Sequence, residues 1–184
     1  ASNPAWNAGA GRVDVYLGDG GALNFLPGWT IVGQAAGELL GAAIAGIGDL
    51  NGDGYADAAV GAPGWTNGPS AVGRVDLLAG SSLAAIPLTP IASLEGDAAT
   101  DRLGYGAEVD ALGDVNGDGY ADVFVSREAA AVPPQDYAEI VYGGPAGAGF
   151  RQIFGGCGLS LARATSIDTD ADGFPEVHVG EPNS

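Results

Sequence analysis

The chain has 184 residues, of which 46% are hydrophobic, and 23 acidic residues against 6 basic ones give it a net charge of −17. A surface this acidic repels nucleic acid and anionic lipid, so we expect neither as a partner. The sequence contains no apolar run long enough to span a bilayer, and its single cysteine, Cys157, excludes a disulfide within the chain. The 33 glycines and 11 prolines predict many short strands joined by tight turns.

The N-terminal part of the chain contains three predicted strands. Val13–Leu17 alternates apolar and polar residues and ends at a glycine, and Trp29–Val32 is a second short run with β-branched residues. The third, Ala42–Ile47, belongs to an Ala- and Leu-rich segment that also fits a helix. Glycines at positions 33, 37, 41, 46 and 48 favour a strand there, because glycine weakens a helix.

An acidic cluster follows directly, in the segment DLNGDGYAD. Asp49, Asn51, Asp53 and Asp57 place side-chain oxygens at its first, third, fifth and ninth positions, and Tyr55 would offer a backbone carbonyl from the seventh. A glycine at the sixth position permits the tight turn that lets these groups converge. Several carboxylates in a flexible loop suit Ca²⁺, whereas Mg²⁺ demands a tighter octahedral arrangement. The cluster therefore predicts a calcium site.

The same arrangement recurs twice, so the sequence predicts up to three calcium ions per chain. The third cluster departs from the first two, with Pro175 at its eighth position and a glutamate at its ninth. The predicted ligands of the second cluster are Asp114, Asn116, Asp118, Tyr120 and Asp122, and those of the third are Asp168, Asp170, Asp172, Phe174 and Glu176. Between and after the clusters, further strands are predicted at 73–80, 91–94, 107–112, 137–144, 150–154, 161–167 and 176–179.

An EF-hand or dockerin loop begins in the same way and has to be distinguished. Such a loop requires a bidentate glutamate at its twelfth position and a helix after it. Here the twelfth positions are Val60, Val125 and Val179, and the residues that follow are β-branched or interrupted by glycine and proline. The sequence therefore excludes the EF-hand interpretation.

The spacing of the clusters indicates a repeat architecture. Their first aspartates lie 65 and 54 residues apart, which suits a propeller blade of four short strands. We therefore expect an all-β fold, a β-propeller of four-stranded antiparallel blades, with three blades' worth of strands in one module over 1–184. The approximate repeat units are 1–64, 65–130 and 131–184.

The predicted units are offset at the ends of the chain, which opens on a third strand and closes on a second one. Three blades cannot close a ring alone, because closed propellers have four to eight. Either the chain is a fragment of a longer propeller, or two copies form a homodimer that closes as a six-bladed ring, with each incomplete blade completed by the partner.

These residues resemble the FG-GAP repeats of integrin α-subunits and of many bacterial secreted proteins. That pattern combines a Phe-Gly pair, a DxNxDGxxD calcium loop and Gly-Ala-Pro. Leu40-Gly41 and Tyr105-Gly106 stand at the Phe-Gly position, with Cys157-Gly158 displaced by two residues in the third unit. The triplet 61–63 is Gly-Ala-Pro and 180–182 is Gly-Glu-Pro, whereas 126–128, Ser-Arg-Glu, departs from the motif. The resemblance implies structural calcium ions on one rim and an extracellular or cell-surface location.

For function, we expect a structural or cell-adhesion module, secreted or on the cell surface, that binds a protein or carbohydrate ligand on a propeller rim. The absence of methionine fits a mature or excised piece. Trp6, Trp29 and Trp65 are candidate rim residues, although packing between blades is the simpler explanation. The alternative is a self-assembling half-propeller or propeller fragment without a ligand of its own. A hydrolase or lyase is less favoured, because there is no GxSxG motif and only one histidine; we expect no enzyme activity.

Overall fold

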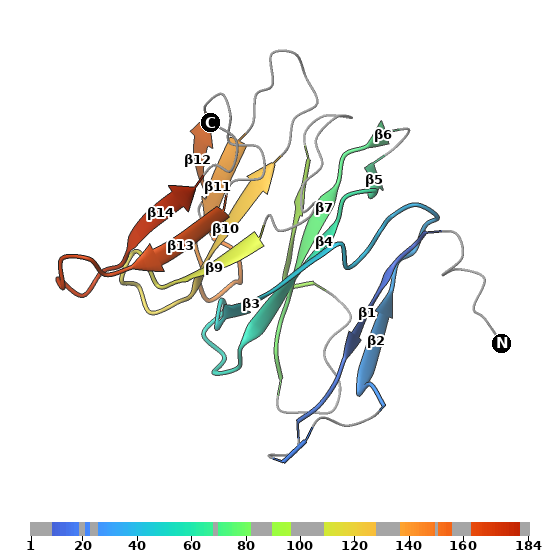
Figure 1. The fold of residues 1–184 in the computed structure, drawn as a ribbon, viewed down its shortest axis with the longest axis horizontal. Helices are drawn as coiled ribbons and strands as arrows, with labels where there is room; N and C mark the ends of the chain where they lie inside the picture. The colour runs from blue at the N-terminus through green and yellow to red at the C-terminus, as the bar shows by residue number, and fades with distance from the viewer. Residues whose placement is uncertain are drawn as a thin grey trace.

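The computed structural model describes residues 9–18, 21–22, 26–67, 70–81, 90–96, 109–127, 137–149, 151–155 and 163–180. Within these ranges every regular element is a β-strand, and all strand pairs are antiparallel, which confirms the predicted all-β class. Among the described residues no helix is long and apolar enough to cross a bilayer. Figure 1 shows the sheets side by side in chain order, from β1 and β2 to β13 and β14.

Two sheets have four strands each, and in both of them consecutive strands are neighbours apart from the inserted β5–β6 hairpin. The acidic clusters connect the first two strands of each sheet, as the sequence predicts. A β-bulge at Ile47 in the first sheet and at Leu112 in the second adjoins the strand pair of the aspartate that ends each loop. The first sheet contains β3 (Ala43–Gly48), β4 (Asp57–Ala62), β7 (Arg74–Leu78) and β8 (Ala92–Glu95); the second contains β9 (Val109–Gly113), β10 (Asp122–Arg127), β11 (Tyr137–Val141) and β12 (Arg151–Gly155).

The two ends of the described chain form two-stranded sheets. β1 (Arg12–Val15) pairs with β2 (Trp29–Val32), and β13 (Arg163–Ile167) pairs with β14 (Glu176–Gly180) around the third cluster. The two pairs are separate sheets, so β1 and β14 do not complete a blade together within the chain. A small hairpin of β5 (Thr66–Asn67) and β6 (Ser70–Ala71) lies in a segment for which no strand is predicted.

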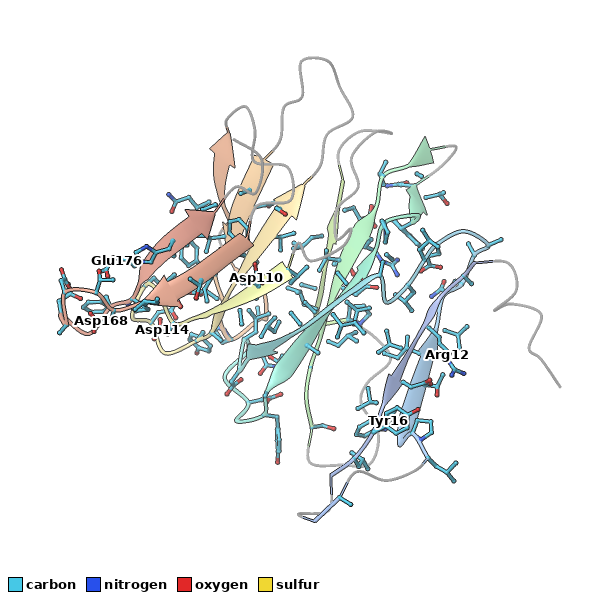
Figure 2. The ribbon with its side chains drawn as sticks, in the orientation of Figure 1. Arg12, Tyr16, Asp110, Asp114, Asp168 and Glu176 are labelled. Atoms are coloured by element: carbon cyan, nitrogen blue, oxygen red, sulfur yellow. The ribbon has the colours of Figure 1, made fainter. Side chains whose placement is uncertain are left out.

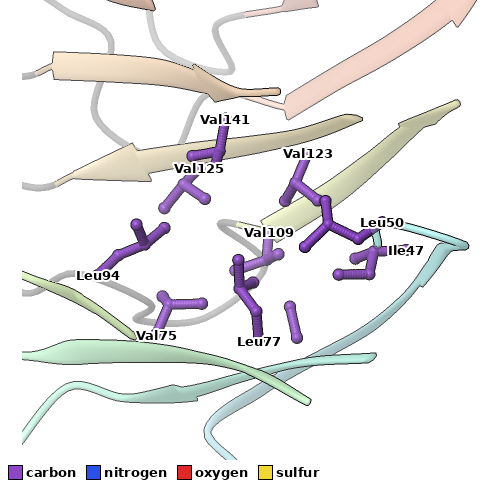
Figure 3. Close-up of a cluster of buried hydrophobic side chains, with 10 residues drawn as sticks. Ile47, Leu50, Val75, Leu77, Leu94, Val109, Val123, Val125 and Val141 are labelled. Carbon is purple, nitrogen blue, oxygen red and sulfur yellow. The ribbon is translucent and has the colours of Figure 1, made fainter. Parts of the chain in front are cut away.

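The largest hydrophobic cluster lies between the two four-stranded sheets (Figure 3). Both sheets contribute to it, so their facing sides are apolar. The cluster contains Ile47, Leu50, Ala59, Val75, Leu77 and Leu94 from the first sheet and its loop, and Val109, Val123, Val125 and Val141 from the second. Removing apolar surface from water contributes about 25 cal/mol per Å², so this cluster stabilises the contact between the two sheets.

The other face of each four-stranded sheet packs against a two-stranded one. In the first sheet, this face contributes Val60, Ala62 and Leu78, which pack against Val13 of β1. Val15 and Ile31 are partly buried against the same cluster. On the far side, Leu112, Phe124, Ala138 and Ile140 pack with Ala164 and Val177 of the last hairpin. Because both faces of the four-stranded sheets are covered, their central strands are apolar on both sides, as in Val123, Phe124 and Val125.

Candidate metal centre

The first acidic loop is organised around the carboxylate of Asp49. Its Oδ1 accepts hydrogen bonds from the backbone N–H groups of Gly52 at 2.7 Å and Asp53 at 3.1 Å, and its Oδ2 accepts one from Gly54 at 2.8 Å. One carboxylate therefore fixes three consecutive amides of the turn. Gly52 and Gly54 have φ values of +75° and +88°, a region that glycine adopts without strain.

Two further side chains of this loop bond to each other and to the turn. The Asn51 amide donates to Asp53 Oδ2 at 3.0 Å, while its Oδ1 accepts from the Asp53 N–H at 2.9 Å. Asp53 Oδ1 accepts from the N–H of Tyr55 at 2.9 Å. The side chains at the first, third and fifth positions thus all form hydrogen bonds within one turn, and their role as calcium ligands stays a prediction.

The second loop repeats these bonds residue by residue. Asp114 accepts from Gly117 at 2.7 Å, from Asp118 at 3.1 Å and from Gly119 at 2.8 Å. The Asn116 amide donates to Asp118 Oδ2 at 2.9 Å, and Asn116 Oδ1 accepts from the Asp118 N–H at 3.0 Å. Asp118 Oδ1 accepts from the Tyr120 N–H at 3.0 Å. The repetition follows from the identical NGDGYAD sequence of both loops.

The ninth-position aspartates, Asp57 and Asp122, differ from the rest because they are buried, with 3% and 0% of their surface exposed. Asp57 accepts from the N–H groups of Leu50 at 2.8 Å and Gly80 at 2.7 Å. Asp122 accepts from their counterparts, Val115 at 2.8 Å and Gly143 at 3.0 Å. Each aspartate ties its loop to the turn after the third strand of the same sheet.

Burial raises the pKa of Asp57 and of Asp122 above the ordinary value of 3.8, because the charged form loses its hydration. The backbone hydrogen bonds lower both pKa values and so oppose this shift. The negative charges of Asp53 and Asp49 raise the pKa of Asp57 further, and those of Asp118 and Asp114 do the same for Asp122.

In calcium-free protein, these two carboxyls should therefore bind protons more tightly in the folded state. Their contribution to stability is present in full below about pH 3.8 and is lost as the pH rises through their raised folded pKa values. A carboxyl ¹³C NMR titration checks this, and we expect Asp57 and Asp122 to titrate above 3.8. Values at or below 3.8 would contradict the burial argument.

The third loop brings four carboxylates together. Asp168, Asp170, Asp172 and Glu176 each offer an oxygen, and these four oxygens lie within 4.8 Å of one another. Figure 2 labels Asp168 and Glu176 at the end of the β13–β14 hairpin. This loop is the most divergent of the three in sequence, yet among the described residues it is the one whose carboxylates converge in this way. This loop has Asp170 where the first two loops have an asparagine, and its ninth-position Glu176 is half-buried, whereas Asp57 and Asp122 are buried.

Glu176 is nonetheless fixed by its neighbour. Its Oε2 accepts hydrogen bonds from the N–H of Thr169, at 2.7 Å, and from the Thr169 hydroxyl. These bonds lower the pKa of Glu176 below its ordinary value of 4.5 and favour the ionised form, which is the form that binds a cation.

Neighbouring loops touch through an aromatic ring at the seventh position. A Cβ added to Gly52 would lie 2.5 Å from the ring of Tyr120, and one added to Gly117 would lie 2.2 Å from the ring of Phe174. Each ring therefore rests on the fourth-position glycine of the loop before it. The backbone is linked as well, since the Ala121 N–H donates to the Asp49 carbonyl at 2.9 Å.

Gly52→Ala should destabilise the protein more than Gly54→Ala. Both positions have positive φ, which costs an alanine about 1–2 kcal/mol, but only Gly52 has a ring in the space of the new methyl group, whereas the space at Gly54 is open. Displacing the Tyr120 ring should cost a further 1–3 kcal/mol or so. Thermal unfolding of the two variants provides the comparison, and equal losses would show that the ring contact contributes nothing.

A buried charged cluster that was not predicted from the sequence includes residues of β7 in the first four-stranded sheet. Arg74 Nη2 lies 2.7 Å from Asp76 Oδ2 and 3.7 Å from Glu38 Oε1, and Glu38 is 1% exposed. Asp76 also accepts from the Ser93 hydroxyl at 2.6 Å. The Arg-Val-Asp triplet, which occurs at 12–14 and at 74–76, is a sequence signal for the Arg74–Asp76 pair, but it does not indicate Glu38.

Trp65 belongs to this cluster. The Arg74 guanidinium stacks over its ring at 3.7 Å from the centroid, and the ring packs against the buried side chains between β1 and the first four-stranded sheet. Trp65 thus takes part in packing between sheets, the simpler of the two explanations. Trp6 lies outside the described residues.

Comparison with known proteins agrees with this geometry. The FG-GAP repeat family matches residues 40–78, which run from the Leu-Gly pair through the first acidic loop to the end of β7. Integrin α-IIb of Mus musculus is 28% identical over 96% of the chain, and integrin α-PS2 of Drosophila melanogaster is 27% identical over 85%. Residues 40–78 thus match an FG-GAP repeat, and the chain is similar to integrin α-subunits.

The chain spans only part of these relatives, 18% of the mouse protein and 12% of the fly protein. Within the matched repeat, Leu40 is buried against Val60 and Ala62. A Cβ added to Gly41 would lie 2.8 Å from the carbonyl oxygen of Arg12, so a larger residue would not fit. The Leu-Gly pair therefore anchors the segment before the acidic loop to β1.

Proposed function

We propose that this chain is a calcium-binding, integrin-like β-propeller module in which the cations stabilise the rim loops. The observation that carries the proposal is the third loop, where Asp168, Asp170, Asp172 and Glu176 offer oxygens within 4.8 Å of one another. Four carboxylates this close repel one another in the absence of a cation, and hard oxygen ligands in a flexible loop suit Ca²⁺.

The first two loops support the same proposal through their side-chain placement. Asp49, Asn51 and Asp53 gather around one turn and are exposed or half-buried, so a cation can reach them from solvent. Asp57 would complete the set from the buried side, with Tyr55 supplying its carbonyl. The corresponding proposal for the second loop uses Asp114, Asn116, Asp118, Tyr120 and Asp122, and for the third it adds the carbonyl of Phe174.

Isothermal titration with Ca²⁺ tests the ligand sets. The parent should bind up to three ions, and Asp53→Ala, Asp118→Ala and Asp172→Ala should each remove one. Glu95→Gln is the matched control, because Glu95 is an acidic residue outside the loops that accepts a hydrogen bond from Asn67. Unchanged stoichiometry in all three loop variants would refute the assignment.

The biological role that we propose is structural and adhesive, at the cell surface or in the extracellular space, with a protein or carbohydrate ligand on a propeller rim and no catalysis. Similarity to two integrin α-subunits supports this role. Binding of candidate ligands to immobilised protein, with and without calcium, tests it; a calcium-bound module that captures no protein or glycan would favour the alternative of a propeller piece without a ligand.

Closure of a six-bladed ring by two copies remains a prediction. Light scattering in calcium tests it directly, because a homodimer would have twice the monomer mass of 18.1 kDa.

A further inference from the structure

Asparagine is followed directly by glycine at three places in the sequence, and two of them lie in the acidic loops. Asn51-Gly52 and Asn116-Gly117 occupy the third and fourth positions of the first and second loops, and Asn67-Gly68 lies outside the loops. Asn-Gly is a self-reactive pair, because glycine has no side chain to keep its backbone nitrogen away from the asparagine side chain. The pair therefore brings its own chemistry to each loop, independent of any ligand.

The reaction available to such a pair is deamidation. In the first loop, the backbone nitrogen of Gly52 loses its proton and attacks Cγ of Asn51; a C–N bond forms, the bond from Cγ to Nδ2 breaks, and Nδ2 takes up a proton and leaves as ammonia. Water then opens the resulting succinimide ring. Breaking the new bond at Cγ leaves aspartate, whereas breaking the original peptide bond leaves isoaspartate, in which the chain runs through the side chain. Water is the only co-reactant.

Both reacting groups form other bonds in the folded first loop. The Gly52 N–H donates to Asp49 Oδ1 at 2.7 Å, and the negative carboxylate opposes loss of the proton. The Asn51 side chain is bonded to Asp53, because its Oδ1 accepts from the Asp53 N–H at 2.9 Å and its amide donates to Asp53 Oδ2 at 3.0 Å. The attack requires the first of these bonds to break, and the other two restrain the Asn51 side chain from turning.

The second loop restrains its pair in the same way. The Gly117 N–H donates to Asp114 Oδ1 at 2.7 Å. The Asn116 amide donates to Asp118 Oδ2 at 2.9 Å, and Asn116 Oδ1 accepts from the Asp118 N–H at 3.0 Å. The same three hydrogen bonds therefore oppose deamidation in both loops.

Packing between neighbouring loops restrains the two glycines further. The ring of Tyr120 packs on Gly52, and the ring of Phe174 packs on Gly117. A glycine that attacks its asparagine has to move towards that side chain, so the ring on it would have to shift as well. Opening of a loop is therefore the step that precedes reaction.

The third pair has a different environment and serves as an internal reference. Asn67 is exposed, and its amide donates a hydrogen bond to Glu95 Oε2 at 3.1 Å. The residue two positions before it is Trp65, whereas both loops have an aspartate there that bonds to the glycine N–H. Gly68 lies outside the described residues.

We propose that Asn51 and Asn116 are sites of deamidation that react only when their loop opens. The closed loop suppresses the reaction through its hydrogen bonds, and a bound cation suppresses it further by holding the loop closed. This second effect rests on the proposed calcium binding, and the first does not. Each loop thus keeps its asparagine for as long as it stays closed.

Both products change the loop. Aspartate at position 51 would give the first loop acidic side chains at the first, third, fifth and ninth positions, as the third loop has with Asp170. An ionised aspartate cannot donate as the Asn51 amide does, so two carboxylates would meet where that amide now bonds to Asp53. Isoaspartate adds a methylene group to the backbone ahead of Gly52, so the amides that Asp49 holds would no longer match its carboxylate.

Peptide mapping by mass spectrometry measures the reaction at all three pairs of the full chain. The chain is kept in chelator, well below its melting temperature, and in parallel in chelator with denaturing urea, so that each site is compared with itself. We expect Asn51 and Asn116 to react at least about tenfold more slowly in the folded chain than in urea, and Asn67 to differ by less than about threefold. Loop sites that react as fast in the folded chain as in urea, equal protection of all three sites, or no reaction of the loop sites in urea would each overturn the proposal.

Adding calcium separates the modification sites from the proposed function. At a hundredfold excess of calcium over its dissociation constant, both loop sites should slow by a further factor of roughly one hundred, while Asn67 is unchanged. Protection in chelator without further slowing in calcium would contradict the proposed calcium binding and support the restraint by hydrogen bonds.

Asn51→Asp reproduces the aspartyl product, and Asn67→Asp adds the same charge outside the loops as the matched control. In chelator, we expect the melting temperature of Asn51→Asp to lie at least about 2 °C below that of Asn67→Asp, because a hydrogen bond is replaced by two facing carboxylates. Equal melting temperatures would show that the Asn51 amide contributes nothing to the loop and would overturn the predicted effect of this product.

Discussion

Removing calcium should lower the melting temperature of this protein by roughly 5–10 °C for each loop that was occupied. A cation at a hundredfold excess over its dissociation constant stabilises the folded state by about 2.7 kcal/mol per site. For a domain of this size, each kcal/mol shifts the midpoint by about 2–4 °C. The physical cause is the set of carboxylates in each loop, which the folded chain holds close together, as in the group around Asp168.

Differential scanning calorimetry in excess calcium and then in a strong chelator provides the measurement. Magnesium is the control, because it accepts the irregular geometry of such a loop less readily and should restore only part of the loss. Identical midpoints with calcium and with chelator would mean that the acidic loops are stabilised by their backbone hydrogen bonds alone, such as those that Asp49 accepts.

Arg74→Ala should destabilise the protein by roughly 3–5 kcal/mol, because it leaves two buried carboxylates without their cation. The exposed fractions of Glu38 and Asp76 are 1% and 5%, and Arg74 Nη2 is within 4 Å of both. The stacking of Arg74 on Trp65 is lost at the same time. A fall in the melting temperature of roughly 6–20 °C is therefore expected at neutral pH.

Arg12→Ala is the matched control within the same chain. Arg12 forms the equivalent ion pair with Asp14 at 2.8 Å, but its side chain is 39% exposed. An exposed pair is worth about 1 kcal/mol or less. Similar losses in both variants would show that the Arg-Val-Asp motif acts through its strand alone, and that burial of the cluster does not matter.

The strand order of the four-stranded sheets could be predicted because each acidic loop marks the same point in its unit. The predicted strand Trp29–Val32 has the bounds of β2, and the other predicted strands agree with the structure to within two residues, except that 137–144 extends three residues beyond β11. No bounds are predicted for β4, β5, β6 and β10. Turn chemistry and alternation are local properties, so one sequence is enough to recognise them. The Tyr105-Gly106 and Cys157-Gly158 pairs lie outside the described part of the chain.

The features that could not be predicted depend on contacts between distant segments. Glu38 and Arg74 are separated by 36 positions in the sequence, and nothing local distinguishes Glu38 from a solvated acid. The ring of Tyr120 meets Gly52 only because the sheets pack face to face. Likewise, the third loop is the most divergent of the three in sequence, yet among the described residues its four carboxylates are the ones that converge.

The contacts between successive loops have a consequence for how the rim responds to occupancy. The Ala121 N–H donates a hydrogen bond to the carbonyl of Asp49, and the adjacent Tyr120 ring packs on Gly52. The second loop therefore contacts two residues of the first loop directly. The ring of Phe174 links the third loop to the second in the same way. The three turns are thus connected in series along the rim, and thermodynamic reciprocity requires that if filling one loop tightens its neighbour, filling the neighbour tightens the first by the same factor. A rim of this construction can titrate cooperatively without any movement of the hydrophobic core beneath it.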